Sequence, residues 1–204
     1  MSDLNCPNCG DTVPAQLKLV KMMTCQSCQT TLTVLPNDLK QLGKSGELHD
    51  AERLFGLGDT IEFETQSIKI LGHAQFSYGR GMWDEFWGTD KDGAGVWVSL
   101  DEGDIVVQRH IKKMMWPRVS AKPMAGQKIT YLDDTLVISE VETATCISFR
   151  GSFDETLSLG ETYTFVNIQG QSRALVSGEL WPGGQLWFEG YWVDPFEISI
   201  KVTP

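Results

Sequence analysis

The chain has 204 residues, which is enough for one sizeable hydrophobic core or two modest ones. Its 27 acidic residues outnumber its 17 lysines and arginines, and residues 1–35 carry no basic cluster, so a nucleic acid is disfavoured as a partner. No stretch reaches the roughly 18 consecutive apolar residues that a membrane-spanning helix needs. We therefore expect a cytoplasmic protein with no transmembrane segment.

Two Cys-x-x-Cys pairs near the start of the chain are the most specific motif in the sequence. A Cys-x-x-Cys turn brings two thiolates within reach of one metal ion, and two such turns complete a tetrahedral shell of four sulfurs. This spacing predicts a zinc ribbon over residues 1–35, with one structural zinc ion and no open position for a substrate. Gly10 suits the turn after the first pair, whereas Gln29 is less suited to the same place after the second. The predicted metal ligands are Cys6, Cys9, Cys25 and Cys28.

Redox-active pairs or disulfide bonds are the alternative use of these four cysteines. Both are disfavoured, because two spaced pairs occur in a chain whose first residues contain no secretory signal. The fifth cysteine, Cys146, has the pattern of a small core residue in a strand.

Residues 31–35 are predicted to form the last strand of the ribbon, which Pro36 ends. A linker follows over residues 36–55, and its capping residues and apolar spacing predict a short helix. From Gly58 onward, short runs of β-branched and aromatic residues alternate with Gly- and Asp-rich turns, which indicates antiparallel strands. In the first half of this region we expect strands near residues 60–65, 67–78, 82–88, 95–100 and 104–110.

Asp92 and Gly93 give the strongest hairpin-turn signal in the chain. The residues from Asp90 to Asp101 also match several positions of a calcium-binding loop. The calcium interpretation is disfavoured, because such a loop needs a helix on each side and an oxygen ligand where Ala94 stands.

The second half of the chain repeats the pattern of the first. Gly58–Ile61 is similar to Gly126–Ile129, and Ile68–Ile70 is similar to Leu136–Ile138. These similarities predict two related antiparallel β modules of a small barrel or sandwich type. The predicted modules are residues 56–122 and 123–204.

A Trp-x-Glu-x-Trp motif at residues 83–87 is echoed by Trp-x-Glu-x-Tyr at residues 187–191. Because side chains alternate across a strand, the three named residues of each motif share one face. Across the first hairpin, pairing odd-numbered with odd-numbered residues keeps Phe86 with the apolar face of the next strand. The same register gathers on the opposite face Trp83, Glu85, Trp87, Trp97, Ser99 and Asp101.

Aromatic rings beside carboxylates suit an organic cation such as a polyamine. Two other interpretations of this face are packing against another sheet and packing against a second subunit. The candidate ligand-binding or partner-binding residues are Trp83, Glu85, Trp87, Trp97, Asp101, Trp187, Glu189 and Tyr191.

No catalytic constellation is evident in the sequence. The three histidines, His49, His73 and His110, share no motif with a nucleophile or with paired carboxylates, so an enzyme is the less favoured class. A site assembled from distant strands is left open. The only basic cluster, residues 109–118, is best explained as a connector between the modules, and docking onto an acidic partner or a membrane surface is the alternative.

The β region carries short aromatic motifs at Trp83–Phe86, Val96–Val98, Gly103-Asp104, Ser177–Trp181 and Phe188–Tyr191. Together with the N-terminal ribbon, these motifs resemble the bacterial family called domain of unknown function 4178. The resemblance covers most of the chain after Phe55. It implies no defined activity, but it implies a bacterial setting in which members occur beside polyamine-synthase-like and membrane-stress proteins.

These observations favour a non-catalytic adaptor or scaffold, in which the ribbon and the β modules bind other proteins in a bacterial cytoplasmic assembly. The resemblance implies that membrane-stress or polyamine-synthase-like proteins are among the partners. The alternative is a small-ligand module that holds an organic cation such as a polyamine on the face of Trp, Glu and Asp residues.

Overall fold

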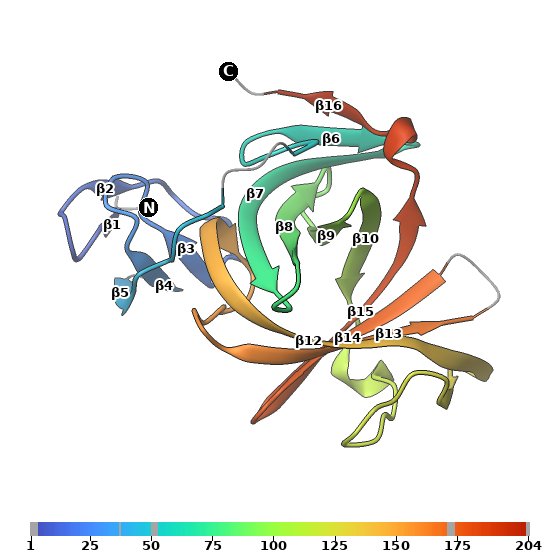
Figure 1. Ribbon diagram of the computed structural model, residues 1–204. Coiled ribbons are helices and arrows are strands. Elements are labelled where there is room, and N and C mark those ends of the chain that lie inside the picture. The colour runs from blue at the N-terminus through green and yellow to red at the C-terminus, as the bar shows by residue number, and fades with distance from the viewer. Residues whose placement is uncertain (1–3, 37, 50–52, 171–173, 203–204) are drawn as a thin grey trace.

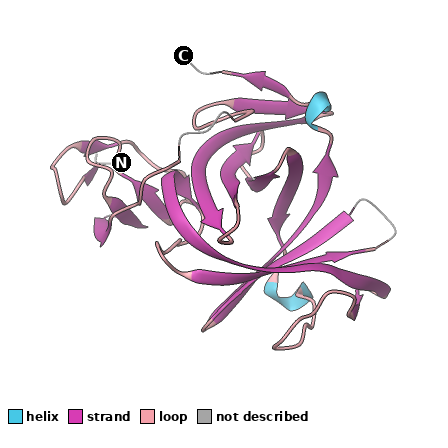
Figure 2. Cartoon of the chain, viewed as in Figure 1, coloured by secondary structure: helices cyan, strands magenta, loops and turns pink. Residues whose placement is uncertain are grey.

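The computed structural model describes residues 4–36, 38–49, 53–170 and 174–202. Figure 1 shows the course of the chain, and Figure 2 shows that strands make up most of it, which confirms the expected mostly β fold. The helices in the described ranges are two single 3₁₀ turns, η1 (Lys113–Met115) and η2 (Pro195–Glu197). No helix in this part of the chain has the length and apolar character needed to cross a membrane.

The N-terminal ribbon combines a short hairpin with three further strands (Figure 1, blue). The hairpin pairs β1 (Leu4–Asn5) with β2 (Thr12–Val13), and the other strands are β3 (Met22–Thr24), β4 (Thr31–Leu35) and β5 (Asp38–Gly43). The strand predicted over residues 31–35 is confirmed as β4, but it is not the last strand of the ribbon, because β5 follows and pairs with it. The small core of the ribbon consists of the buried residues Cys6, Val13, Met23, Cys25, Leu32 and Leu39.

The short helix predicted in the linker is wrong for residues 38–43, which form β5 instead. Residues 44–49 and 53–55 contain no helix either, and Asn37 of the predicted cap lies outside the described residues. Strand β5 covers the free edge of β4 and satisfies backbone groups there. Leu39 is buried in the ribbon core while Leu42 is exposed, so pairing with β4 overrides the local helical spacing.

The first β module is an antiparallel meander of five strands within the described residues. Its strands are β6 (Thr60–Phe63), β7 (Gln66–Ser77), β8 (Met82–Asp90), β9 (Gly95–Asp101) and β10 (Asp104–His110). All five agree with the predicted strands to within two residues at each end. The predicted hairpin turn is confirmed between β8 and β9, where Asp90 Oδ1 accepts hydrogen bonds of 2.9 Å from the backbone N–H groups of Asp92 and Ala94.

The second β module repeats the meander. Its strands are β11 (Lys128–Tyr131), β12 (Asp134–Phe153), β13 (Thr162–Gln169), β14 (Ala174–Trp181) and β15 (Gly184–Val193). The last described strand, β16 (Ser199–Lys201), returns to pair with β6 of the first module.

Strands of both modules close into one ring. Strand β7 pairs with β12 and β10 pairs with β15, so the described sheet runs from β7 through β8, β9, β10, β15, β14 and β13 to β12 and back to β7. Figure 1 shows this ring with the ribbon attached at its left side. The module boundaries drawn from the sequence stay a prediction, because the strands on either side of them belong to the same sheet.

Equivalent hydrogen bonds support the internal repeat. The backbone N–H of Gly58 donates to the carbonyl of Ile70 (3.1 Å), and the N–H of Gly126 donates to the carbonyl of Ile138 (2.8 Å). A register shift follows each of these isoleucines, on β7 against β8 and on β12 against β13. The similarity that the sequence shows between the two modules therefore reflects the same local backbone structure.

Among the described residues of the ring, the sheet separates three apolar clusters. The inner cluster fills one end of the ring, and its large aromatic members are Phe76, Trp83, Trp87, Trp97, Phe149, Phe153, Tyr163 and Phe188. On the outer face of the first module, Phe86 and Val98 pack with residues of β6 such as Ile61. On the outer face of the second module, Trp187 and Val166 pack with residues of β11 and of the connector that follows β10.

The ribbon is joined to the ring by strand pairing. Strand β3 extends the end of β12, with Met23 opposite Ser152 and Met22 opposite Phe153. The backbone N–H of Lys21 donates to the carbonyl of Phe153 over 2.8 Å. Because Met22 also belongs to the inner cluster, the ribbon contributes to the core of the ring.

Candidate metal centre and ligand cavity

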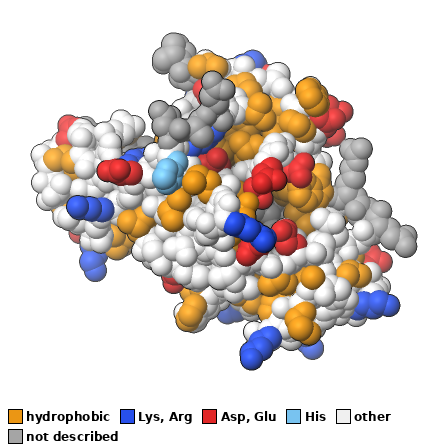
Figure 3. Space-filling model, viewed as in Figure 1, with side chains coloured by type: hydrophobic (Ala, Val, Ile, Leu, Met, Phe, Trp, Pro, Cys, Tyr) orange, Lys and Arg blue, Asp and Glu red, His pale blue; other side chains and the backbone are white. Residues whose placement is uncertain are grey.

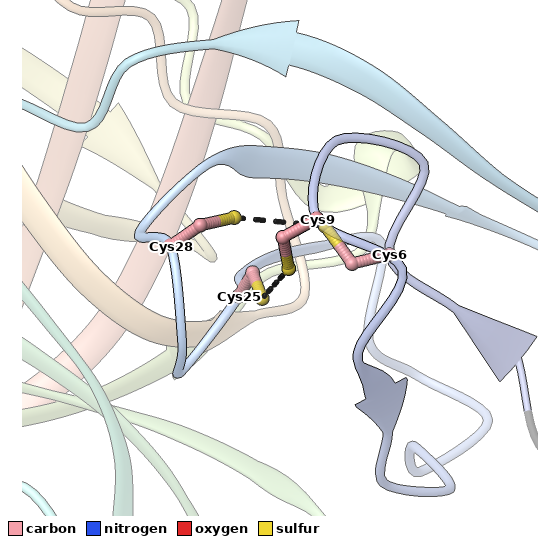
Figure 4. A group of neighbouring side chains, drawn as sticks. All are labelled: Cys6, Cys9, Cys25 and Cys28. Atoms are coloured by element: carbon pink, nitrogen blue, oxygen red, sulfur yellow. Dashed lines mark hydrogen bonds between the residues drawn. The ribbon is translucent and has the colours of Figure 1, made fainter.

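Four cysteine sulfurs converge between the two ribbon turns (Figure 4). The Sγ atoms of Cys6 and Cys28 are 3.7 Å apart, those of Cys9 and Cys25 are 3.8 Å apart, and all four lie within 4.8 Å of one another. The predicted metal ligands are therefore brought together in a cluster that could hold one metal ion. Cys146 lies apart from them, buried in the inner cluster.

Each Cys-x-x-Cys pair sits in a turn of the same geometry. The N–H of Gly10 donates to the carbonyl of Cys6, and the N–H of Gln29 donates to the carbonyl of Cys25, both over 2.8 Å. Gly10 has a φ of 77° and Gln29 a φ of 57°, so both turns end in the left-handed region that favours glycine. The second turn adopts this conformation even though a glutamine occupies the position.

Gln29 links the second turn to the ring through its side chain. Gln29 Oε1 accepts a hydrogen bond from Arg150 Nη2 (3.0 Å), and its carbonyl accepts one from Ser45 Oγ (3.0 Å). Arg150 Nη1 donates to Ser45 Oγ over 2.7 Å, and Arg150 Nη2 donates to the carbonyl of Gly46 over 2.7 Å. A glycine at position 29 would relieve the backbone but would remove one bond between the metal turn and β12.

The local hydrogen bonds push two of the cysteine pKa values in opposite directions. Hydrogen bonds involving Asn8 and Thr30 lower the pKa of Cys28 to about 5, which favours a thiolate. For Cys9, the backbone hydrogen bond at Asp11 lowers the pKa. The combined effect of the neighbouring sulfurs and of burial is larger and in the opposite direction, so the pKa of Cys9 rises to about 12. Four thiolates at these distances repel one another, so a cation at their centre is what allows all four to ionise.

A cavity of about 450 Å³ opens inside the ring, where Figure 3 shows acidic side chains gathered around a hollow. Strands of both modules line it, mainly β8, β9 and β10 on one side and β12, β13 and β14 on the other. Its carboxylates are Glu85, Asp101, Glu102, Asp104, Glu140, Glu142 and Glu179. Its aromatic residues are Tyr78, Trp83, Phe165 and Trp192.

Glu85 is the most deeply buried carboxylate of the cavity wall, with 5% of its surface exposed. Its Oε1 accepts a hydrogen bond of 3.0 Å from Trp83 Nε1, and its Oε2 is buried with no hydrogen-bond partner among the described residues. Burial raises the pKa of Glu85 to about 7, although interactions with the side chains of Ser99 and Trp83 oppose the shift. Near neutral pH this carboxyl is therefore divided between its neutral and charged forms.

Glu179 faces the same cavity from β14. Burial, and then the charges of Glu85 and Asp154, raise the pKa of Glu179 to about 8. Burial and neighbouring acidic residues also raise the pKa of Asp101 at the end of β9. The crowding of carboxylates thus disfavours their charged forms unless a positive charge enters the cavity.

Among the described residues, Arg80 is the basic residue that lines the cavity. Its Nη2 lies 3.1 Å from Glu142 Oε2, and its guanidinium lies 5.6 Å from the centre of the Tyr78 ring. The Arg80 side chain is mostly exposed and neutralises one carboxylate at the rim, and the described lining residues include no other cation to pair with Glu85 or Glu179.

The predicted register between β8 and β9 is confirmed. Glu85 lies opposite Ser99, Phe86 opposite Val98 and Trp87 opposite Trp97, which is a pairing of odd with odd residues. Of the candidate residues on this face, Trp83, Glu85 and Asp101 line the cavity. Trp87 and Trp97 are buried in the inner cluster behind it.

The structure separates the second predicted motif from the first. Trp187 belongs to the outer cluster of the second module, Tyr191 packs against the outer cluster of the first, and Glu189 is exposed. On β15 it is the even-numbered residues, such as Phe188 and Trp192, that face the inside of the ring. The two motifs are also not equivalent in the repeat, because one lies on the third strand of its module and the other on the fifth.

Sequence reasoning missed the side of the cavity that β12, β13 and β14 contribute. The alternation of Ser177 and Glu179 is a signal for a polar inner face on β14, and the same holds for Glu140 and Glu142 on β12. Nothing in the sequence shows that these strands face Glu85, because the closing pairs of the ring join segments far apart in the chain.

The sequence profile of the family described as "Domain of unknown function (DUF4178)" matches residues 56–195, well over half of the chain. The match covers the strands of the ring and leaves the cysteine ribbon outside. No curated protein and no solved structure matches this chain.

Proposed function

The chain belongs to the DUF4178 family, and we propose that it binds an elongated organic cation of the polyamine class in the cavity of the ring. The observation that carries this proposal is the composition of the cavity wall, where the described residues include seven carboxylates, Glu85, Asp101, Glu102, Asp104, Glu140, Glu142 and Glu179, and a single arginine. Glu85 is buried, Glu142 and Glu179 are half-buried and the other four are exposed, and negative charge at the buried and half-buried positions is unfavourable unless a cation offsets it.

The spacing of the carboxylates supports a ligand with several separated charges. Asp101 lies two residues beyond Ser99, the partner of Glu85, so Asp101 is offset from Glu85 by roughly 7 Å along the strand direction on the same face of the sheet. A linear polyamine carries ammonium groups separated by short methylene chains, so one group can approach Glu85 while the next approaches Asp101. The methylene groups between them suit the aromatic rings of Trp83 and Phe165.

A metal ion is a poorer match for this cavity. Within the described residues, the cysteine cluster is where three or more metal-ligand atoms come together, and the cavity carboxylates form no comparable group. A compact divalent cation needs several oxygen atoms within about 2.5 Å of its centre. Carboxylates spread over several strands suit an extended ligand instead.

We also propose that the metal ion of the cysteine cluster is zinc. Tetrahedral coordination with zinc–sulfur bonds of about 2.3 Å separates neighbouring sulfurs by about 3.8 Å. The distances of 3.7 and 3.8 Å between paired sulfurs support this assignment. A shell of four cysteines leaves no position for water, so the role of the zinc is to stabilise the ribbon.

The adaptor role, the bacterial cytoplasmic setting and the membrane-stress or polyamine-synthase-like partners stay predictions from the sequence. A cation site and an adaptor role are compatible, since a bound cation can change the affinity for a partner protein. An adaptor also requires a surface that fits that partner.

The test of the cation proposal is a calorimetric titration of the full-length protein with three probes: spermidine, a neutral diol of similar length, and magnesium chloride. We expect spermidine to bind and the other two to give no binding at the same concentrations. Magnesium that binds as tightly as spermidine and displaces it would contradict the proposal, because the cavity would then recognise charge alone.

A further inference from the structure

The ribbon carries a groove of about 460 Å³ that has no part in the metal centre or the ring cavity. Its walls come from residues 13–18, 20–21 and 34–36, and Leu4 of β1 and Leu39 of β5 complete it. The volume falls within the range of small binding sites, although the ribbon is a small unit. The groove is therefore large for the unit that forms it.

The groove is apolar and partly open to solvent. Val13 and Leu39 are buried in the ribbon core, but Leu17 and Leu35, which line the same groove, are 46% and 40% exposed. A small domain has few apolar residues with which to form a core, so two exposed leucines beside one groove are unfavourable for the isolated ribbon. A partner that covers them would recover the hydrophobic free energy of both side chains.

The charge at the groove is opposite to that of the chain as a whole. Among the described residues, Lys18 and Lys21 line it, no aspartate or glutamate does, and neither lysine forms an ion pair, although the charge of Lys21 acts on the buried Glu155. The net charge of the chain is −10, so this groove is a positive site on an acidic protein. Such a site complements a partner that carries acidic side chains beside apolar ones.

The groove favours recognition through side chains. Pro14 and Pro36 lie in its two walls and have no N–H to donate, which disfavours the addition of a partner strand along either wall. The groove is also held in place, because Gln16 in its wall accepts a hydrogen bond of 2.9 Å from Ser152 Oγ at the end of β12. A partner therefore meets a preformed surface, which reduces the entropy lost on binding.

We propose that this ribbon groove binds a short segment of another protein that carries leucine-like side chains flanked by aspartate or glutamate. The apolar side chains cover Leu17 and Leu35, and the carboxylates pair with Lys18 and Lys21. None of these four residues lines the ring cavity, so this proposal and the cation proposal can be tested independently.

A random-peptide display library selected against the full-length, metal-loaded protein tests the proposal. We expect enrichment of peptides that combine Leu, Ile or Phe with Asp or Glu. Binding of an enriched peptide, followed by fluorescence anisotropy, should weaken about tenfold or more in Leu17→Ser and in the double variant Lys18→Glu/Lys21→Glu. The matched controls are Leu42→Ser and Lys40→Glu, which change exposed residues of the same ribbon outside the groove and should leave the affinity unchanged.

Three outcomes would overturn the proposal. The first is enrichment of basic peptides, or no enrichment over the Lys18→Glu/Lys21→Glu variant. The second is binding to vesicles of phosphatidylglycerol that depends on Lys18 and Lys21 without any peptide preference. The third is a native dimer that Leu17→Ser converts to a monomer, since the groove would then belong to a second copy of the chain.

Discussion

The cysteine cluster and the ring cavity are two places where this chain brings ionisable acidic groups close together. They differ in how the repulsion between the negative charges is reduced. In the cluster, four sulfurs lie within 4.8 Å of one another and can surround one ion completely. In the cavity, carboxylates are spread over about 450 Å³ and raised pKa values keep part of the charge neutral. The comparison contrasts a cluster that could hold a structural metal ion with a cavity for which we propose an exchangeable ligand.

The largest effect should come from removing the metal. Structural zinc contributes on the order of 10 kcal/mol to the folding of a ribbon, so chelation should unfold residues 4–43. The ring should remain folded but less stable, because Met22 and the β3–β12 pair belong to its core and sheet. Hydrogen exchange with and without a chelator measures both regions.

If the ribbon amides stayed fully protected from hydrogen exchange after complete removal of metal, the proposed structural role of the ion would be contradicted, since the ribbon would then fold without it. Metal analysis of the purified protein gives an independent check. Less than half an equivalent of zinc per chain would contradict the zinc assignment.

The next-largest effect is a dependence of the free energy of unfolding on pH, which we expect from the cavity carboxyl Glu85. Glu85 has a pKa of about 7 in the folded protein, against an ordinary value of 4.5 in the unfolded chain. Between these values the folded state binds more protons than the unfolded state, so the free energy of unfolding falls as the pH rises through this window. For Glu85 alone the loss amounts to about 3 kcal/mol.

Urea unfolding of the native protein and of Glu85→Gln between pH 5 and 8 isolates this contribution. The difference between the two proteins should shift in favour of the variant as the pH rises, because glutamine cannot ionise. Spermidine should stabilise the native protein more at pH 8 than at pH 6, since it binds the charged cavity. A difference that does not vary with pH would show that Glu85 titrates as an ordinary carboxyl.

Much of this account could be read from the sequence, and the limits have physical causes. Strand bounds and the β8–β9 register follow from local alternation and from the Asp92-Gly93 turn, so both were accessible. The closing pairs β7–β12 and β10–β15 depend on contacts between distant segments, and alternation alone does not say which face of a strand is turned inward. This is why the sequence indicates Glu85 but not Glu179 as a residue of the inner face, and why it does not show that the 187–191 motif lies on the outer face.

The linker shows a different limit. Residues 38–43 have the capping residue and the leucine spacing of a short helix, yet they form β5 because the edge of β4 offers backbone partners. At Gln29 the sequence suggested a less suitable turn, and the structure shows the compensation in its bond to Arg150.

The smallest expected effect is a change in stability on substitution of Gln29, and it compares the turns of the two Cys-x-x-Cys pairs. Gln29→Gly relieves a left-handed backbone conformation but loses the hydrogen bond to Arg150, and these two effects of about 1 kcal/mol each should nearly cancel. Gln29→Ala loses the bond without relieving the backbone and should destabilise the protein by about 1 kcal/mol. Thermal unfolding of the zinc-loaded variants measures the difference, and equal stability of the two would show that the backbone at position 29 is unstrained.

The central claim is that the ring cavity holds a polyamine, and a calorimetric titration of spermidine into native protein, Glu85→Gln and Glu189→Gln tests it most directly. The two variants make the same chemical change, but Glu85 lies in the cavity wall and Glu189 is exposed on the outer face of β15. We predict that native protein and Glu189→Gln bind spermidine equally and that Glu85→Gln, shown by circular dichroism to be folded, binds about tenfold more weakly. No binding by native protein at millimolar spermidine, or equal binding by all three proteins, would contradict the claim.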